Sequence, residues 1–185
     1  MTGIGGQGIQ LAARVLAQGA IAEGREVQLF GSYGGMMRGG STEATLVVAD
    51  RPVLSPPTIG TTWSAILMHH AYAQPTLARL GPGSVVVVNT SVFEGPRQRP
   101  DCVVVDVAAT DTALELGNMM VASMVMLGAY AAVTGLVTIG GLLDAVAASL
   151  PSYRTQHGEL NRTALQVGYD RAPVGLAPAW AEIRA

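Results

Sequence analysis

Gly3-Ile4-Gly5-Gly6-Gln7-Gly8 is the first of two glycine-rich stretches, and the second reads Ser32-Tyr33-Gly34-Gly35-Met36-Met37-Arg38-Gly39-Gly40. Glycine at this density lets a backbone come close to another surface, because the residue has no Cβ. Arg38 supplies a fixed cation whose planar guanidinium suits phosphate or carboxylate. The two stretches predict loops that approach an anionic group or the backbone of another subunit.

Outward from these stretches, helical and strand patterns alternate. Apolar residues recur at helical spacing from Gln7 to Glu23, and Gly24 ends that helix. Strands are predicted at 27–30, 42–48, 65–68, 84–89 and 102–107. The four valines at 85–88 are typical of a strand covered on both faces. We therefore expect an α/β fold of three layers, α/β/α, with a mostly parallel sheet.

The last third of the chain reads as helical. Helices are predicted at 110–116, 119–137, 138–150 and 156–169. Thr138 is predicted to be the N-cap of the helix at 138–150. Neither an internal repeat nor a long linker divides the sequence. We expect residues 1–185 to form a single domain, because this length buries a core without disulfides or metals.

Residues 119–137 carry no charge and approach the length of a membrane span. Their content of Ala, Gly, Ser and Thr, without flanking basic residues, favours a central buried helix instead. Asn118 is predicted to be its N-cap. We interpret the methionines at 119, 120, 124 and 126, which fall on more than one face, as core or interface filler.

The composition is 49% hydrophobic and 13% charged, with a net charge of −2. That balance indicates a subunit that buries surface against partners, or a compact alanine-rich core. The charge offers no attraction for nucleic acid or membrane. Cys102 is predicted to be a buried strand thiol, and one cysteine can form neither an internal disulfide nor an iron–sulfur cluster. Without a signal peptide pattern, a cytoplasmic setting is expected.

The first stretch matches the dinucleotide-binding pattern at Gly3, Gly5 and Gly8. The pattern should follow a full strand, and a carboxylate should close the second strand to hold the ribose. Here Met1 and Thr2 alone precede it, and Gly31 and Ser32 close the second strand. An NAD site is therefore disfavoured, while contact between an anion and the helix N-terminus stays open.

The histidines offer no metal site by their spacing. His69 and His70 fall where a strand becomes a helix, without a carboxylate or third ligand at metal spacing. They are interpreted as surface or interface residues, and His157 as a solvated residue of a polar loop. No metal ligand and no catalytic residue is predicted in this chain.

Gly3 to Ile9, Ser32 to Ser41 and Pro52 to Pro56 together resemble the gamma subunit of 2-oxoacid:ferredoxin oxidoreductases. That subunit is shared by enzymes for pyruvate, 2-oxoglutarate, indolepyruvate, 2-ketoisovalerate and phenylglyoxylate. The likeness continues through Leu116-Gly117-Asn118 to Leu160-Asn161, and so covers nearly the whole chain. The family usually has a fuller strand before its first loop, which suggests a late start codon or an atypical edge strand here. Gly35-Met36 replaces a Pro-Glu or similar pair, which affects details of partner contact.

The resemblance implies an enzyme in which this chain is not the catalyst. Thiamine diphosphate, Mg²⁺ and 4Fe–4S clusters would belong to partners, namely alpha and beta subunits and an iron–sulfur subunit. Coenzyme A would take the acyl group, and electrons would pass through those partners to ferredoxin or another acceptor. The isolated chain is expected to be inactive.

The resemblance also implies a site at the subunit interface, where this chain lines the coenzyme A channel. The implied residues are Gly5, Gly6, Gln7, Gly8, Ser32, Tyr33, Gly34, Arg38, Gly39 and Gly40. Arg38 suits a coenzyme A phosphate and an intersubunit salt bridge equally. Two other functions stay open: a purely architectural subunit, and a stand-alone nucleotide-binding oxidoreductase domain.

Overall fold

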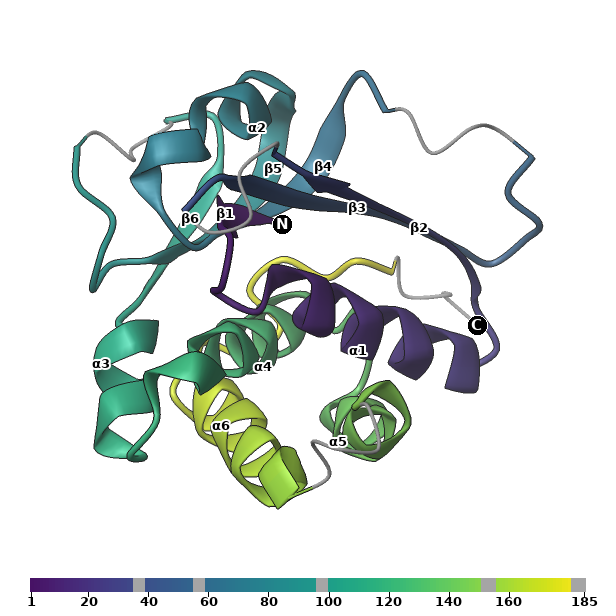
Figure 1. Ribbon diagram of the computed structural model, residues 1–185. Helices are drawn as coiled ribbons and strands as arrows, with labels where there is room; N and C mark the ends of the chain where they lie inside the picture. Colours follow the sequence, from purple (N-terminus) through teal and green to yellow (C-terminus); the bar gives the residue numbers. More distant parts are fainter. Residues whose placement is uncertain (35–38, 55–58, 96–99, 151–155, 181–185) are drawn as a thin grey trace.

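The computed structural model describes residues 1–34, 39–54, 59–95, 100–150 and 156–180, without the side chain of Tyr33. Its strands form a six-stranded sheet in the order β2-β3-β1-β4-β5-β6 (Figure 1). The strands are β1 Thr2–Ile4, β2 Glu26–Tyr33, β3 Ser41–Ala49, β4 Thr62–Leu67, β5 Leu80–Asn89 and β6 Val103–Val107. All five strand regions predicted from the sequence are present.

The sheet is mixed, and most of its strands are parallel. β1, β4, β5 and β6 run parallel to one another, whereas β3 is antiparallel to both β1 and β2. The chain leaves β2 and returns as β3 through the second glycine-rich stretch, with Tyr33 paired to Thr42 at the near end. A connection this short can join only antiparallel strands, which explains the departure from a fully parallel sheet.

Helices cover both faces of the sheet, as the three-layer prediction expected. In Figure 1, α1, α4, α5 and α6 lie on one side of the sheet and α2 on the other. The helices are α1 Ile9–Ala22, α2 Gln74–Ala78, α3 Ala109–Glu115, α4 Ala122–Thr134, α5 Ile139–Ser149 and α6 Gly158–Asp170, with short 3₁₀ turns η1 His70–Tyr72 and η2 Met119–Val121.

Successive side chains of β5 point to opposite faces of the sheet and contribute to two separate core clusters. Val85 and Val87 face the larger cluster beneath α1 and α4, while Val86 and Val88 face a smaller cluster with Leu77 of α2. Both faces of this strand are therefore buried, as its four valines predicted.

The apolar stretch forms the short turn η2 and then α4, in which every residue is buried. Asn118 caps the beginning of this segment, since its Oδ1 accepts the Met120 N–H at 3.0 Å. Thr138 caps α5, since its Oγ1 accepts the Gly141 N–H at 3.1 Å. Both capping predictions are confirmed. In the part of the chain that is described, no helix is long and apolar enough to cross a membrane.

Two expectations about strands are corrected. β1 is not an edge strand: it lies in the sheet interior between β3 and β4, because the sheet order depends on long-range pairing. Cys102 lies just before β6 and is half-buried rather than buried within the strand, because β6 forms an edge of the sheet.

Candidate functional site

The first glycine loop is held in shape by the side chain of Gln7. Its Oε1 accepts the Ile4 N–H at 2.8 Å, and its Nε2 donates to the Met68 carbonyl at 3.4 Å. The Gln7 backbone N–H also donates to the Ile4 carbonyl at 3.1 Å. Gln7 therefore turns its amide toward the protein's own backbone and fixes the turn between β1 and α1.

A backbone hydrogen bond joins the two glycine-rich loops. The Gly5 N–H donates to the Gly40 carbonyl at 2.8 Å, and the Gly34 N–H donates to the Ser41 carbonyl at 2.7 Å. The Tyr72 hydroxyl donates to the Gly39 carbonyl at 3.3 Å. Gly39 and Gly40 therefore lie beside the first loop, and the two glycine-rich stretches meet at this point.

The N-terminus of α1 lies at this surface without a side-chain cap. Gly8 is the N-cap residue, with a φ of 78°, and no described side chain accepts a hydrogen bond from the first turn. A Cβ at Gly8 would come within 2.5 Å of the Ser123 hydroxyl, so glycine is required there for two reasons. Uncapped N–H groups carry a partial positive charge, which favours an anion at this end of the helix.

A cavity of about 640 Å³ opens beside this helix end. Its described lining carries no carboxylate, and the one titratable side chain there is His157. The lining consists of Gly5, Gly6, Gly8, Ile9, Gln10, Leu11, Thr42, Asn118, Met120, Val121, Leu150, His157 and Asn161. The cavity is therefore roomy and compatible with a negatively charged ligand.

The far wall of this cavity comes from residues more than a hundred positions away. Asn118 caps η2, and Asn161 donates through Nδ2 to the His157 carbonyl at 2.7 Å. His157 lines the cavity and is exposed, in agreement with the prediction that this residue is solvated. Neither Asn118 nor Asn161 was among the predicted site residues. The Gly-Asn and Leu-Asn pairs within the resemblance were the signal that marked them.

The predicted site residues fall into four groups. Gly5, Gly6 and Gly8 line the cavity. Gln7 supports the loop from within. Gly34, Gly39 and Gly40 shape the second loop, and Ser32 is exposed near the end of β2. Arg38 and the side chain of Tyr33 lie outside the described residues, as does the Gly35-Met36 pair that departs from the family pattern.

The paired histidines have local structural partners. His69 Nδ1 accepts the Ala71 N–H at 3.1 Å, and burial lowers the pKa of this imidazole, with a smaller effect from His70. His70 Nδ1 lies 3.1 Å from the Val92 carbonyl oxygen and 3.2 Å from the Glu94 amide nitrogen. Among the described residues, no group of His, Cys, Asp or Glu is arranged to hold a metal ion.

Comparison with known proteins identifies the family. Residues 1–171 match the family described as pyruvate ferredoxin/flavodoxin oxidoreductase. The pyruvate synthase subunit PorC of Methanothermobacter thermautotrophicus is 32% identical over 170 residues, which span 91% of each chain. The gamma subunit of a keto/oxoacid ferredoxin oxidoreductase from Geobacter sulfurreducens superposes with a TM-score of 0.75 at 28% identity, over 92% of this chain and 95% of that one.

A larger enzyme contains the same fold as one part. The 2-oxoglutarate:ferredoxin oxidoreductase from Magnetococcus marinus matches with a TM-score of 0.77 at 15% identity, over 94% of this chain and 32% of that one. The chain belongs to the pyruvate ferredoxin/flavodoxin oxidoreductase family, as a gamma subunit of a 2-oxoacid:ferredoxin oxidoreductase complex. Other subunits of such a complex are its partners.

Proposed function

We propose that this subunit packs beside the active site of a thiamine diphosphate-dependent oxidoreductase and lines its coenzyme A channel. The complex would convert a 2-oxoacid and coenzyme A into an acyl-CoA and CO₂, and pass two electrons to ferredoxin. Thiamine diphosphate, Mg²⁺ and iron–sulfur clusters would sit in partner subunits. This chain would bind and orient the acyl carrier.

One observation carries the proposal. The uncapped N-terminus of α1 and the bare backbone of Gly5, Gly6 and Gly8 face a cavity whose described lining has no carboxylate. Coenzyme A carries phosphate groups, and helix N-termini bind phosphate through free N–H groups and the helix dipole. The related Magnetococcus structure contains bound coenzyme A and succinyl-CoA, which makes this ligand class the one to test.

The second loop extends the proposed wall. Gly39 and Gly40 lie against the first loop through the Gly5–Gly40 hydrogen bond. Ser32, Tyr33 and Arg38 belong to the same stretch of chain, and we propose that they face the same channel. Gln7 would act from within, by holding the loop that the ligand touches.

Gly5→Ala tests the proposal in the assembled complex. The added Cβ would lie 3.6 Å from the Gly40 oxygen and 3.7 Å from the Gly39 nitrogen, which are ordinary contacts, so the subunit tolerates it. A ligand packed on this backbone would not. We expect the KM for coenzyme A to rise about tenfold, the effect of losing one close contact. The KM for the 2-oxoacid should stay unchanged.

Gly60→Ala is the matched control. Gly60 is exposed, and a Cβ there would meet no atom within 4 Å. Both variants should copurify with the partner subunits in wild-type proportion. An unchanged KM for coenzyme A in Gly5→Ala would contradict the channel role and favour a purely architectural subunit.

The Arg38 guanidinium suits either a coenzyme A phosphate or an intersubunit salt bridge, and Arg38→Ala distinguishes between these two roles. A raised KM for coenzyme A with intact assembly supports a phosphate contact. Loss of the complex on size-exclusion chromatography supports an intersubunit salt bridge. If neither measurement changes, Arg38 takes no part in the proposed site.

A further inference from the structure

Ser123 carries a buried hydroxyl that no described residue satisfies. The residue lies in the first turn of α4 and is 1% exposed, and its Oγ has no hydrogen-bond partner among the described residues. A hydroxyl in this position destabilises the folded chain, because it loses its hydrogen bonds to water and gains none in return. Packing of the described residues therefore gives no reason for a polar side chain here.

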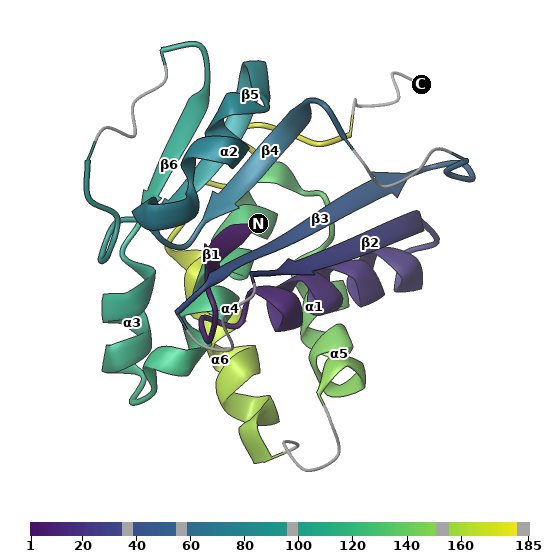
Figure 2. The same cartoon turned by 45° about the horizontal axis from the view of Figure 1, so that its top comes forward.

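The Ser123 hydroxyl is directed at the beginning of α1. A Cβ placed on Gly8, the N-cap residue of α1, would lie 2.5 Å from Ser123 Oγ and 3.4 Å from Ser123 Cβ. The oxygen is thus the nearer end of the side chain, and it lies where a side chain of the N-cap residue would itself begin. α1 and α4 lie on the same side of the sheet in Figure 2, and they pack against each other.

The backbone donors at this end of α1 are also unpaired. No described side chain caps the helix, and no described backbone carbonyl accepts the N–H groups of Ile9, Gln10 or Leu11. These N–H groups and the Ser123 hydroxyl therefore lie unpaired at the same end of one helix. A group with several acceptor oxygens satisfies both kinds of donor at once.

The charge of the two helix ends favours an anion at this place. Both α1 and α4 begin here, and neither has an acidic residue in its first turn. The N-terminal end of a helix carries a partial positive charge, so two such ends side by side repel each other. Gly8 also lines the cavity of about 640 Å³, whose described lining has no carboxylate. A phosphate group that enters from this cavity would offset the repulsion and accept hydrogen bonds from the unpaired donors.

We propose that Ser123 is a binding residue for a phosphate group of coenzyme A, and that its hydroxyl donates to a phosphate oxygen held by the N–H groups of α1. This inference rests on the proposed function and adds to it a side chain of α4. The hydroxyl is unfavourable in the empty subunit and favourable when the ligand is bound. The diphosphate and the 3′-phosphate of coenzyme A share the chemistry that this site recognises.

Ser123→Ala tests the proposal, because it removes the hydroxyl and breaks no hydrogen bond among the described residues. In the assembled complex, the KM for coenzyme A should rise about tenfold, as for a lost hydrogen bond to a charged group. The kcat at saturating coenzyme A should stay unchanged. In the isolated full chain, the same substitution should raise Tm by about 3 °C, because an unpaired buried hydroxyl is lost. A purely structural serine would not combine weaker binding with higher stability.

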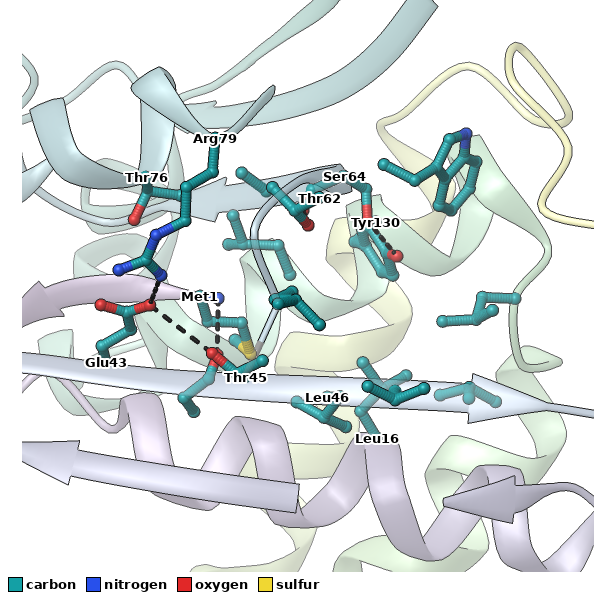
Figure 3. Close-up of a pocket in the computed structure, with 18 of the residues that line it drawn as sticks. Met1, Leu16, Glu43, Thr45, Leu46, Thr62, Ser64, Thr76, Arg79 and Tyr130 are labelled. Atoms are coloured by element: carbon teal, nitrogen blue, oxygen red, sulfur yellow. Dashed lines mark hydrogen bonds and ion pairs between the residues drawn. The ribbon is translucent and has the colours of Figure 1, made fainter. Parts of the chain in front are cut away.

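Thr76→Val is the matched control. Thr76 is also buried without a described partner for its hydroxyl, and it lines a separate cavity of about 260 Å³, where Figure 3 shows it beside Arg79. Its substitution should likewise raise Tm and should leave the KM for coenzyme A at the wild-type value. An equal rise in KM for the two variants would overturn the proposal. A fall in Tm for Ser123→Ala would also overturn it, since the hydroxyl would then have a structural partner.

Dephospho-coenzyme A, which lacks the 3′-phosphate, identifies the phosphate group that Ser123 contacts. Calorimetry on the assembled complex measures the Kd of both ligands. Weaker binding of coenzyme A alone in Ser123→Ala assigns the residue to the 3′-phosphate, and weaker binding of both ligands assigns it to the diphosphate. If Gly5→Ala raises the KM for coenzyme A and Ser123→Ala does not, the role of Ser123 is overturned while the proposed function stands. Unchanged values in both variants overturn the two together.

Discussion

Gly168 of α6 lies directly against the backbone carbonyl of Val125 in α4. The contact is reciprocal, because Gly128 of α4 lies against the backbone carbonyl of Leu165 in α6. A Cβ at either glycine would come well under 3.0 Å from backbone atoms that cannot move independently of their helix. The two helices therefore pack backbone to backbone, and this contact helps to enclose the central helix α4 completely.

Gly168→Ala is expected to destabilise the protein by about 1–3 kcal/mol, because the added methyl group must push the two helices apart. For a chain of this length, each kcal/mol corresponds to a fall in Tm of about 2–4 °C. Urea unfolding followed by circular dichroism measures the change. Gly128→Ala should behave in the same way.

Gly140→Ala is the control for this pair of variants. Gly140 is exposed within α5, and its Cβ would lie 3.9 Å from the nearest atom, Thr138 Oγ1. Alanine is the better helix former by about 0.5–1 kcal/mol, so this variant should gain stability. A loss at Gly140 equal to that at Gly168 would contradict the packing explanation.

Gln7→Ala should destabilise the first loop. Removing the amide leaves the Ile4 N–H without the acceptor that it has at 2.8 Å. An unpaired polar group of this kind costs about 1–3 kcal/mol when it is shielded from water. Gln18→Ala is the control, since Gln18 is exposed on α1, the helix that follows the loop, and alanine is favourable there. Equal stability of the two variants in urea would contradict this role of Gln7.

The sequence was sufficient where local pattern and tertiary burial agree. The valines at 85–88 are buried on both faces of β5, and Thr138 caps α5, so both predictions needed only local information. The position of β1 between β3 and β4 was not predictable in that way. It depends on pairing with residues forty and sixty-five positions away. No local pattern carries that information.

Only the glycine-loop side of the candidate site could be predicted from the sequence. The glycine density of residues 3–8 indicates a bare backbone turn, and Gly5, Gly6 and Gly8 do line the cavity. Asn118 and Asn161 join them only because α4 packs against both α1 and α6. Each has a local hydrogen bond that explains its presence without a site. The direction of the Gln7 amide depends on Met68, a distant partner that spacing does not reveal.

Tyr130 should make stability depend on pH in the alkaline range. Burial raises the pKa of its phenol to about 12, from an ordinary value of 10.0. The unfolded chain therefore loses this proton at lower pH than the folded chain, and stability falls as the pH rises from 10 to 12. This difference in pKa corresponds to a decrease of at most roughly 3 kcal/mol in the free energy of unfolding. Urea unfolding at several pH values measures the slope.

Tyr130→Phe removes that titration. It also leaves the Ser64 hydroxyl without the partner that lies 2.8 Å away, at a cost of about 1 kcal/mol near neutral pH. The variant should thus be less stable at pH 7 and should lose less stability than the wild type above pH 10. Parallel alkaline curves for the two proteins would show that Tyr130 does not cause the slope.

The amino group of Met1 should produce a slope of opposite sign near neutrality. Burial lowers its pKa from 8.0 to about 6, although Glu43 partly opposes the shift. The unfolded chain then binds more protons between these values, so stability rises from pH 6 to pH 8 and is lost on acidification. The lowered pKa of His69 acts in the same direction, but only near and below its ordinary value of 6.5. Urea unfolding between pH 6.5 and 8 therefore isolates Met1, and N-terminal acetylation should flatten the curve there. An acetylated chain with an unchanged slope would assign the effect to another group.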